Sequence, residues 1–402
     1  MTLLRNVNIK TQDSPSVDAF ARLRVSVPTT IFDSKQTIDN APLFWDDQEV
    51  SGATTTSTHS KPYARSRLGV ALNTAGKRVR QTFQRFNYQP GKSQLIILTG
   101  VMGTGASGIT GEIGMFDDNN GLFFRNDDAV MSVVVRSGVT GSPVDTVVVQ
   151  SSWNKDKMDG TGVSGITLDF SKTQIFFMDF EWLGVGRVRF GFFVAGKPYY
   201  CHEALHANVL DSVYMSTPNL PLRYSIENDG TGVASTLDHI CSSVAVEGGV
   251  QDIGIVKYVS TASVHVDANT IGTLYAAVGL RLKTTALSAV VKIVTATLLS
   301  KTADAYEWVL VLNPTIAGTF TYVDIADSPL QRALGTTANT VTGGTFIGGG
   351  FASAAAGVIQ PIISERYLGS TIAGVSDRIV LCVRPMATNA DIEGGLSWKE
   401  LV

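Results

Sequence analysis

Short runs of β-branched and aromatic residues, separated by turn residues, are the feature that most constrains the fold of this chain. From about residue 80 these runs recur at intervals of roughly 10 to 20 residues, with Gly, Asn and Asp between them. They include "QLIILTG", "MSVVVRSG", "DTVVVQSSW" and "TQIFFMDFEW". Short strands at such spacing are typical of β-sandwiches. The sequence therefore predicts a mainly β fold of the sandwich, or jelly-roll-like, kind.

The clearest strand pattern lies in the stretch "GRVRFGFFVAGKPYY". Val188, Phe190 and Phe192 are spaced two apart, so their side chains share one face of a strand. Arg187 and Arg189 share the other face. The "AGK" that follows supplies a tight turn, so this stretch predicts a β-hairpin.

A second β-rich region begins after "VEGGVQD", residues 246–252, and includes "SVHVDA", "YEWVLVLNP", "DRIVLCVRP" and "GGLSWKEL". Its piece "LSAVVKIVTATLLS" has a helical periodicity, but its Val, Ile and Thr content favours a strand. A chain of 402 residues exceeds what one core usually supports. Charged residues make up only 17% and glycines number 39, which suits turn-rich β domains. We therefore predict two sandwich domains, residues 76–250 and 251–402.

The first 75 residues differ from the rest of the chain. They are polar, contain the low-complexity run "SGATTTSTHS", and place short apolar pieces between Pro and Asp breaks. This pattern predicts an extended N-terminal arm over residues 1–75 rather than a domain. Such an arm docks either on another molecule or on its own first sandwich.

The stretch "YYCHEALHAN" contains the spacing H-E-x-x-H. On a helix, His202 and His206 would be zinc ligands and Glu203 a general base. The stretch follows directly from the hairpin strand, which leaves little room for a helix. In a strand, the two histidines share a face and Glu203 points to the other. We expect a structural role, with His202 and His206 as weak candidates for a metal site.

Two carboxylates, Asp179 and Glu181, lie two residues apart in "FFMDFEWLG". The stretch resembles the "E-I-D-I-E-F-L-G" strand of laminarinase-type glycosidases, in which a first Glu is the nucleophile. Phe177 occupies that position here, so the double-displacement reaction has no first step. We expect no enzymatic activity. A sugar-binding surface that uses Asp179, Glu181 and Trp182 stays open as an alternative.

Three other motifs have simple structural interpretations. "GTGASG" follows a strand but precedes no helical pattern, so we interpret it as a loop between strands rather than a phosphate site. "FDDNNGLFF" and "WNKDKMDGTG" collect oxygen ligands without EF-hand spacing, so turns are expected and calcium stays open. "KRVRQTFQRF" is interpreted as a buried apolar face beneath solvated arginines.

Charge and composition restrict the partners and the compartment. The formal net charge of -3 gives no electrostatic case for nucleic-acid binding. No apolar stretch is long enough to span a membrane, and "MTLLRNVNIK" lacks the apolar run of a signal peptide. The three cysteines form no CxxC pair and are expected to be buried free thiols. We expect synthesis in the cytoplasm, no cofactor, no membrane and no nucleic-acid partner.

One long stretch carries a family resemblance. "VDAFARLRVSVPTTIFDSKQ", residues 17–36, resembles the signature "DAFGRLRVS-x-P-x-TLFDSKQ" of a family of virion structural proteins of tailed phages and some large DNA viruses. The chain departs from the signature at Ala21, in place of Gly, and at Ile31, in place of Leu. The resemblance continues through "QSSWNKDKMDGTGVSGITLD", "FEWLGVGRVRFGF", "YMSTPNLPLRYSIEN" and the closing "LSWKEL". It supplies no catalytic residues.

The resemblance implies a non-enzymatic virion protein: a capsid-decoration, head–tail or tail-fibre component. An assembly arm would combine apolar anchors with charged residues; its candidates are Phe20, Arg22, Leu23, Arg24, Val25, Phe32 and Asp33. The expected partners are further copies of the chain, as a homotrimer, and other virion proteins. The alternative function is a glycan-binding, lectin-like module that attaches to the host surface.

Overall fold

The computed structural model describes residues 17–20, 23–24, 27–262, 264–302, 305–353, 357–361, 367–387 and 389–401. Its contacts divide the chain into two compact units. The first contains Met1–Gln81 and Tyr88–Gln251, and the second contains Thr82–Asn87 and Asp252–Val402. Both are built from antiparallel sheets, so the predicted mainly β sandwich fold is confirmed. No helix among the described residues is long and apolar enough to cross a membrane.

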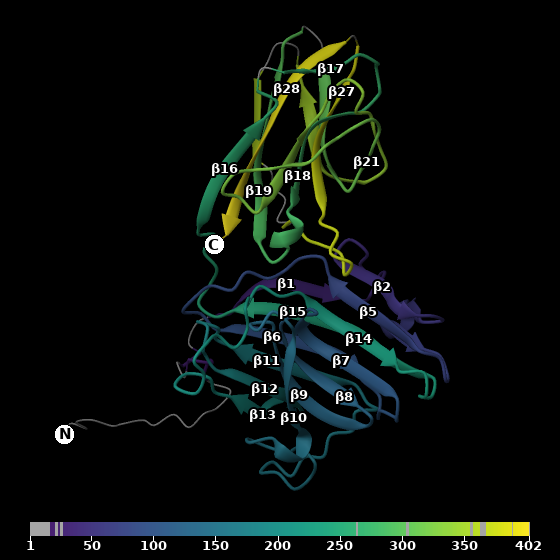
Figure 1. Ribbon diagram of the computed structural model, residues 1–402, viewed down its shortest axis with the longest axis vertical. Coiled ribbons are helices and arrows are strands. Elements are labelled where there is room, and N and C mark those ends of the chain that lie inside the picture. The colour runs from purple at the N-terminus through teal and green to yellow at the C-terminus, as the bar shows by residue number, and fades with distance from the viewer. Residues whose placement is uncertain are drawn as a thin grey trace, which may run out of the picture. The chain divides into compact units, whose positions relative to one another are not determined.

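Two large sheets form the first unit (Figure 1). The eight-stranded sheet has the order β13-β12-β11-β6-β15-β4-β3, with β1 paired to β15. Its strands are β1 Thr29–Lys35, β3 Thr56–Ser60, β4 Arg65–Val70, β6 Gln94–Val101, β11 Gln174–Phe180, β12 Val188–Val194, β13 Lys197–Ala204 and β15 Ser235–Val246. The seven-stranded sheet has the order β10-β9-β8-β7-β14-β5-β2. Its strands are β2 Trp45–Gly52, β5 Gly76–Thr82, β7 Ile109–Phe116, β8 Gly121–Asp127, β9 Val130–Ser137, β10 Val144–Val149 and β14 Leu222–Asn228.

The core of the first unit lies between its sheets. Phe124, from the seven-stranded sheet, packs its ring 5.1 Å from Phe176, 5.5 Å from Phe190 and 5.0 Å from Phe192 of the other sheet. Phe190 and Phe192 are fully buried, as the alternation of their strand predicts. The expected hairpin is confirmed: β12 pairs with β13, and Ala195 at the turn has a positive φ of 48°. Gly196, the next residue of this turn, also has a positive φ, a conformation that a residue without a Cβ adopts without strain.

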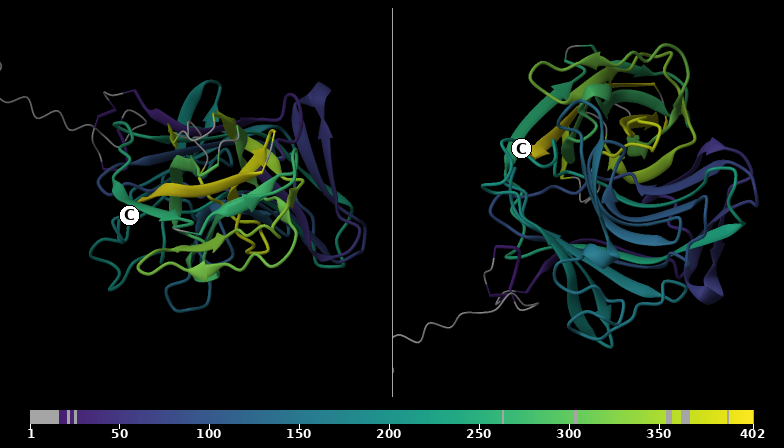
Figure 2. Two further views of the ribbon diagram at one scale, coloured as in Figure 1. Left: turned by 90° about the horizontal axis from the view of Figure 1, so that it is seen from above. Right: turned by 60° about the horizontal axis from the view of Figure 1, so that its bottom comes forward.

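The second unit also consists of two facing sheets, which Figure 2 shows from two further sides. One sheet has the order β16-β28-β19-β26, with β17 paired to β28, and the other has the order β22-β23-β18-β27-β20-β25. The strands of the first are β16 Gly254–Ser260, β17 Val266–Ala268, β19 Val290–Ser300, β26 Gly357–Pro361 and β28 Ala390–Leu401. Those of the second are β18 Tyr275–Leu282, β20 Tyr306–Leu312, β22 Val323–Asp324, β23 Leu330–Leu334, β25 Thr345–Ala352 and β27 Arg378–Pro385. A small pair, β21 Thr315–Ile316 and β24 Val341–Thr342, lies outside both sheets.

Apolar residues from both sheets form the core of the second unit. Trp398 and Ile293 from one sheet belong to the same buried cluster as Trp308 and Leu280 from the other. The ambiguous "LSAVVKIVTATLLS" forms β19, so its β-branched content outweighed its helical periodicity. A one-sided burial pattern along this strand confirms the strand interpretation.

The N-terminal arm of residues 1–75 differs from the expectation of one extended segment. Its described part contributes four strands to the first sandwich: β1, β3 and β4 to the eight-stranded sheet and β2 to an edge of the seven-stranded sheet. β4 and β1 pair one after the other along the same strand, β15. β15 is twelve residues long and therefore needs two shorter partners to satisfy its backbone groups. The polar composition of the arm reflects edge strands rather than an absence of structure.

Candidate functional sites

Asp179 is the centre of a buried ionic cluster in the first unit. It lies on β11, has no solvent exposure, and its Oδ1 is 2.7 Å from Nε of Arg189 on the neighbouring β12. Its Oδ2 is 2.5 Å from Nη2 of Arg24 and accepts a hydrogen bond of 2.7 Å from the Tyr200 hydroxyl. Arg24 also lies 3.4 Å from Glu247. Two carboxylates therefore balance two guanidinium groups, as burial of charge requires.

This cluster holds the start of the described chain. Nη2 of Arg189 donates to the carbonyl oxygen of Val17 at 2.9 Å. Arg187, on the same side of the sheet, donates to the carbonyls of Ala19 at 2.8 Å and of Asp18 at 3.0 Å. Val17 itself is buried. The two arginines thus bind the backbone carbonyls of residues 17–19. Burial, and next the Asp179 carboxylate, raise the pKa of the Tyr200 hydroxyl well above its ordinary value.

The arm candidates contact the chain's own first sandwich. Phe32 is buried on β1, and Arg24 belongs to the ionic cluster. Leu23 is 55% exposed, and Asp33 pairs at the surface with Lys35. Phe20 is half-buried, and its backbone N–H donates to the Asp18 carboxylate. The candidates Arg22 and Val25 lie outside the described residues. Phe32 and Arg24 are thus bound within the unit, as in the intramolecular alternative, whereas Leu23 and Asp33 are exposed.

The glycan candidates do not form an open site. Asp179 is buried in its ion pairs. Glu181 follows the end of β11, and its Oε1 accepts from the backbone N–H of Arg187 at 3.1 Å. Trp182 is half-buried and donates its indole N–H to the carbonyl of Met215 at 3.1 Å. These groups support the chain around the ionic cluster, and Asp179 and Glu181 do not form an open carboxylate pair for a sugar.

The H-E-x-x-H stretch lies on β13 and in the loop after it, as expected for a strand. His202 is buried and accepts from the backbone N–H of Asn154 at 3.3 Å. His206 lies against Gly186, with its Nδ1 2.6 Å from the carbonyl oxygen, and its ring stacks on Tyr214 at 4.1 Å. Burial lowers the pKa of both histidines. Each ring has a separate local partner, and the described residues bring no third ligand to them.

Glu203, the third member of that motif, faces away from the histidines. It pairs with Lys155 at 2.6 Å and lies 3.6 Å from Arg187. The alternation of side chains along a strand predicted that Glu203 would lie on the face opposite to the two histidines. The H-E-x-x-H residues therefore bind the edge strand β13 to the loops beside it.

The oxygen-rich loops are hydrogen-bonded turns. Asp117 accepts from the backbone N–H groups of Asn119 and Asn120, both at 2.8 Å. Asp156 accepts from the N–H groups of Met158 at 2.9 Å and Ser164 at 2.7 Å. These bonds use the carboxylate oxygens that a calcium ion would need.

Within the described residues, one group of three side chains has the spacing of a cation site. His265 and Asp267 beside β17 and Asp391 on β28 place their ligand atoms within 4.8 Å of one another. Nε2 of His265 is 2.8 Å from Asp267 and 4.0 Å from Asp391. These residues could hold a divalent cation, although partly exposed acidic groups commonly lie together without one.

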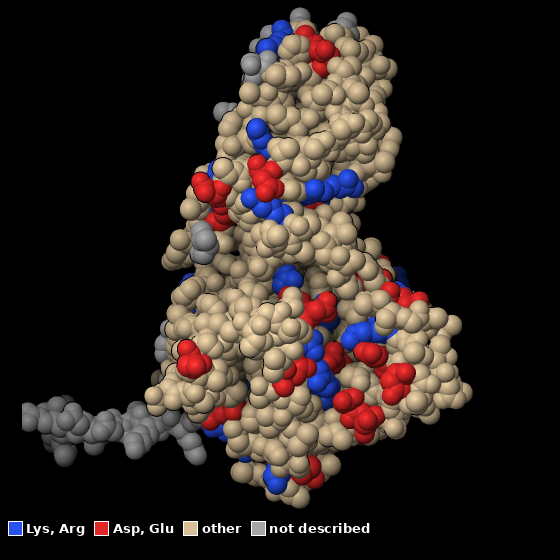
Figure 3. Space-filling view, in the orientation of Figure 1, with Lys and Arg blue, Asp and Glu red and all other residues tan. Residues whose placement is uncertain are grey.

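The seven-stranded sheet carries a charged face. Lys, Arg, Asp and Glu side chains gather over β5, β7 and β14 in the space-filling view (Figure 3). Lys77 on β5 lies 2.9 Å from Glu227 on β14. Farther along the same sheet, on β7 to β10, Arg125 lies 2.8 Å from Glu112 and 2.6 Å from Asp145, and Arg136 lies 2.7 Å from Asp145. Beneath them the ring of Phe123 is fully buried, with both guanidinium groups about 5 Å from its centre. This face is therefore held by internal ion pairs over an apolar layer.

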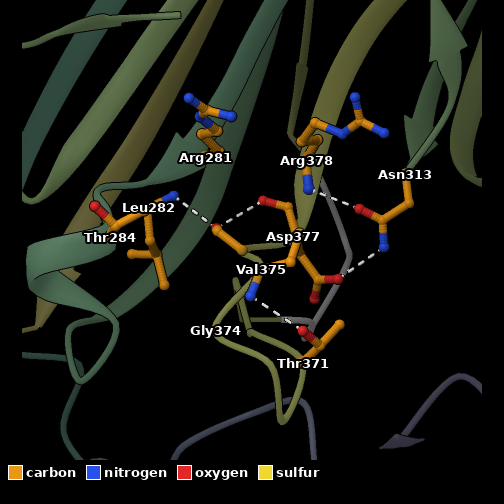
Figure 4. A pocket seen from close by; sticks show the side chains of 10 residues that line it. Arg281, Leu282, Thr284, Asn313, Thr371, Gly374, Val375, Asp377 and Arg378 are labelled. Carbon is orange, nitrogen blue, oxygen red and sulfur yellow. Dashed lines mark hydrogen bonds between the residues drawn. The ribbon is translucent and has the colours of Figure 1, made fainter.

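A pocket in the second unit was not predicted from the sequence. It has a volume of about 540 Å³ and lies where β18 and β20 end and β27 begins (Figure 4). Asn313 and Asp377 form part of its wall, with Nδ2 of Asn313 donating to Asp377 at 2.7 Å. Arg281 and Arg378 line it as well. The only sequence signal for it was the polar residue at the end of each of these strands, which is equally common at ordinary turns.

The comparisons with known proteins leave the family open. No protein-family model and no curated protein matches this chain. Among solved structures, it is similar to the CBM2 module of the evolved Dit of Lactobacillus casei BL23 phage J-1, with 8% identity over 56% of this chain and 98% of that chain, at a TM-score of 0.37.

Two further solved structures are similar to a comparable degree. A legume lectin-like domain from Entamoeba histolytica shares 10% identity over 56% of this chain and 100% of that chain, at a TM-score of 0.32. A putative beta-glucanase from Mycobacterium abscessus shares 11% identity over 54% of this chain and 99% of that chain, at a TM-score of 0.35. Likenesses at this level carry no argument about function.

Proposed function

We propose that this chain is a non-enzymatic structural component of a virus particle, such as a capsid-decoration, head–tail or tail-fibre protein. The observation that carries the proposal is where the resembling stretches lie. Residues 17–36, which resemble the virion signature, contact residues 180–192, which carry the resemblance further along the chain. Arg187 and Arg189 of the second stretch bind the backbone of the first. The residues that carry the resemblance therefore stabilise the fold of the first unit.

The chemistry of the former catalytic candidates supports a structural role. The carboxylate of Asp179 is bound by two arginines and a tyrosine, and Glu203 by Lys155. A general acid or base needs a carboxyl or imidazole within reach of a substrate proton. These groups instead stabilise the packing of their own strands.

Assembly through the arm is proposed to occur by exchange of β1 between copies. β15 needs a strand along Cys241–Val246 whether that strand comes from its own chain or from a neighbour. Exchange of an identical element is a low-cost route to oligomers, because the contacts are the same in both states. We propose a homotrimer held in this way, within a particle that contains other virion proteins.

Mass spectrometry of purified virus particles that encode this chain tests the proposal. We expect the chain among the particle proteins, at a copy number that is a multiple of three. Native mass spectrometry of the purified chain should show multiples of 42.9 kDa. Absence of the chain from washed particles would contradict a virion role, and a monomer at all concentrations would contradict strand exchange.

Glycan binding at the host surface is the second candidate function. It is favoured by the pocket of the second unit, with its few polar side chains, rather than by Asp179, Glu181 and Trp182. Small-ligand sites are concave and carry a few polar groups that fix the ligand's orientation, and this pocket has both properties. Loss of particle adsorption to host polysaccharide after pocket substitutions, with incorporation unchanged, is the result that would support it.

A further inference from the structure

Two arginines are neighbours on adjacent strands beside the pocket of the second unit. Arg281 on β18 and Arg378 on β27 are direct cross-strand partners. Like charges placed directly opposite in a sheet destabilise it. Among the residues that the structure describes, neither guanidinium group forms an ion pair with a carboxylate. Elsewhere in the unit, exposed basic residues do find such partners, for example Lys301 with Glu393 at 2.8 Å.

The nearest acidic residue in sequence does not neutralise this pair. Asp377 is only 2% exposed, and its Oδ1 accepts from Asn313 Nδ2 at 2.7 Å. Its Oδ2 accepts from the backbone N–H of Gly369 at 3.2 Å. Figure 4 shows the Asp377 carboxylate directed toward Asn313, while both guanidinium groups point away from that carboxylate. The carboxylate is therefore used to fix the pocket wall.

Neighbouring groups hold Arg281 in place. Its Nε donates to Oε1 of Gln331 at 2.7 Å, and its guanidinium group lies 4.3 Å from the centre of the Tyr322 ring. The Tyr322 hydroxyl is buried and makes no hydrogen bond to any described residue. This hydroxyl lies over Gly279, where an added Cβ would come within 2.8 Å of it. Tyr322 therefore contacts Arg281 through its ring and not through its hydroxyl.

We propose that this pocket binds the negatively charged group of an acidic sugar, a carboxylate or a phosphate ester, between Arg281 and Arg378. Guanidinium groups bind both anions with short, charge-assisted hydrogen bonds. The hydroxyl groups of Thr284 and Thr371 in the lining offer hydrogen bonds to the sugar ring. The proposal rests on the second candidate function and names its substrate class. It also explains the unpaired arginines, because the bound anion supplies the missing negative charge.

Titration calorimetry of the full chain tests this inference. The probes are glucuronic acid and glucose 6-phosphate, with glucose and inorganic phosphate as comparisons. We expect saturable binding of both acidic sugars and at least tenfold weaker binding of glucose. Binding of inorganic phosphate as tight as that of glucose 6-phosphate would overturn recognition of a sugar. Equal binding of glucose would overturn the role of charge, and no binding of either acidic sugar would overturn the site.

Three variants locate the site. Arg281→Gln and Arg378→Gln are each expected to weaken acidic-sugar binding by about tenfold or more, because each removes a charge-assisted contact. Arg332→Gln on the adjacent strand β23 is the matched control and should bind normally, since Arg332 does not line the pocket. Unchanged affinity in both pocket variants would contradict the assignment.

The melting temperature without ligand tests the arginine pair independently of the sugar that is chosen as the probe. Without ligand, Arg378→Gln should raise the melting temperature, because it removes a cross-strand repulsion. A lower melting temperature would show that the arginine pair stabilises the apo fold and would overturn the argument. If particles with Arg378→Gln still adsorb to host polysaccharide, glycan binding stands but this pocket is not its site.

Discussion

At the scale of single residues, the most deeply buried charges of the described chain have several partners. Asp179 and Arg189 have no exposure and complete each other's hydrogen bonding. Arg80 is also fully buried and donates Nε to His239 at 3.1 Å and Nη1 to Asp47 at 3.1 Å. The expectation of solvated arginines in "KRVRQ" is wrong for Arg80. Sequence patterns assign arginine to the surface, whereas here a histidine and a carboxylate from other strands compensate its burial.

Arg24→Gln should lower the free energy of unfolding by about 2 kcal/mol, because Asp179 then loses a charged hydrogen-bond partner while it stays buried. Urea denaturation measures the difference. Lys35→Gln is the matched control, since Lys35 and Asp33 form a pair that is 66% and 63% exposed, 3.7 Å apart. Equal stability of Arg24→Gln and wild type would show that the cluster does not hold the arm.

His239 should make the protein less stable in mild acid. Burial, and next the charge of Arg80, hold its pKa well below the ordinary value, so the folded state resists protonation. As the pH falls through about 6.5, the unfolded chain takes up the proton first, and the free energy of unfolding decreases. Stability is fully present above that pH and is lost below it. Melting temperatures from pH 8 to pH 5 measure this loss.

His239→Gln should reduce that pH dependence, and the part that remains belongs to His202 and His206, whose pKa values burial also lowers. A glutamine can still accept a hydrogen bond from Arg80, but it does not titrate. A slope as steep as that of the wild-type protein would place the acid sensitivity at another group.

At the scale of elements, the strong strands were predictable and the edge strands were not. The runs that read as strands from residue 80 onward form β6, β9, β10 and β11. β2 and β3, in contrast, expose residues on both faces, and their sequences "WDDQEVSG" and "TSTHS" show no alternation. An edge strand is held by backbone hydrogen bonds to one neighbour, which any sequence can make. The sequence therefore could not identify β2 and β3 as strands, and they were assigned to an extended arm.

Removal of residues 1–36 should destabilise the first unit. It deletes β1, leaves Cys241–Val246 of β15 without a partner on that side, and exposes the surface that Phe32 covers. We expect a lower melting temperature and a loss of about 3 kcal/mol or more. A synthetic peptide of residues 17–36 should bind the truncated protein and restore its stability.

A truncation of residues 1–16 alone is the control for that experiment, because it keeps β1 and Arg24. Melting of the longer truncation at the wild-type temperature, or failure of the peptide to bind, would contradict both the role of β1 and its exchange between copies.

At the scale of the whole molecule, the two units are linked by more than one passage of the chain. Thr82–Asn87 belongs to the second unit, although the residues on both sides of it belong to the first. The backbone N–H of Ser370 donates to the carbonyl of Phe83 at 2.9 Å, and Phe86 is buried. The second unit therefore contains a segment that lies 165 residues before its main part (252 − 87).

Cleavage between the units should leave the two fragments associated. A protease site inserted at Gly248, in an exposed turn, would cut the chain before the second unit. The fragments should elute together in gel filtration under native conditions, because residues 82–87 stay bound in the second unit, and separate in denaturant. Separation without denaturant would show that this segment does not hold the unit.

The sequence by itself determined the mainly β class, the core strands and the hairpin at residues 188–204. It did so because alternation, β-branched content and turn residues act over a few neighbouring residues. Only the tertiary structure decided that Asp179 would be bound by Arg24, that Arg80 would be buried, and that Arg281 would be a neighbour of Arg378. Each of these arrangements brings together residues that lie far apart in the chain, and the local patterns around each residue do not specify its partner.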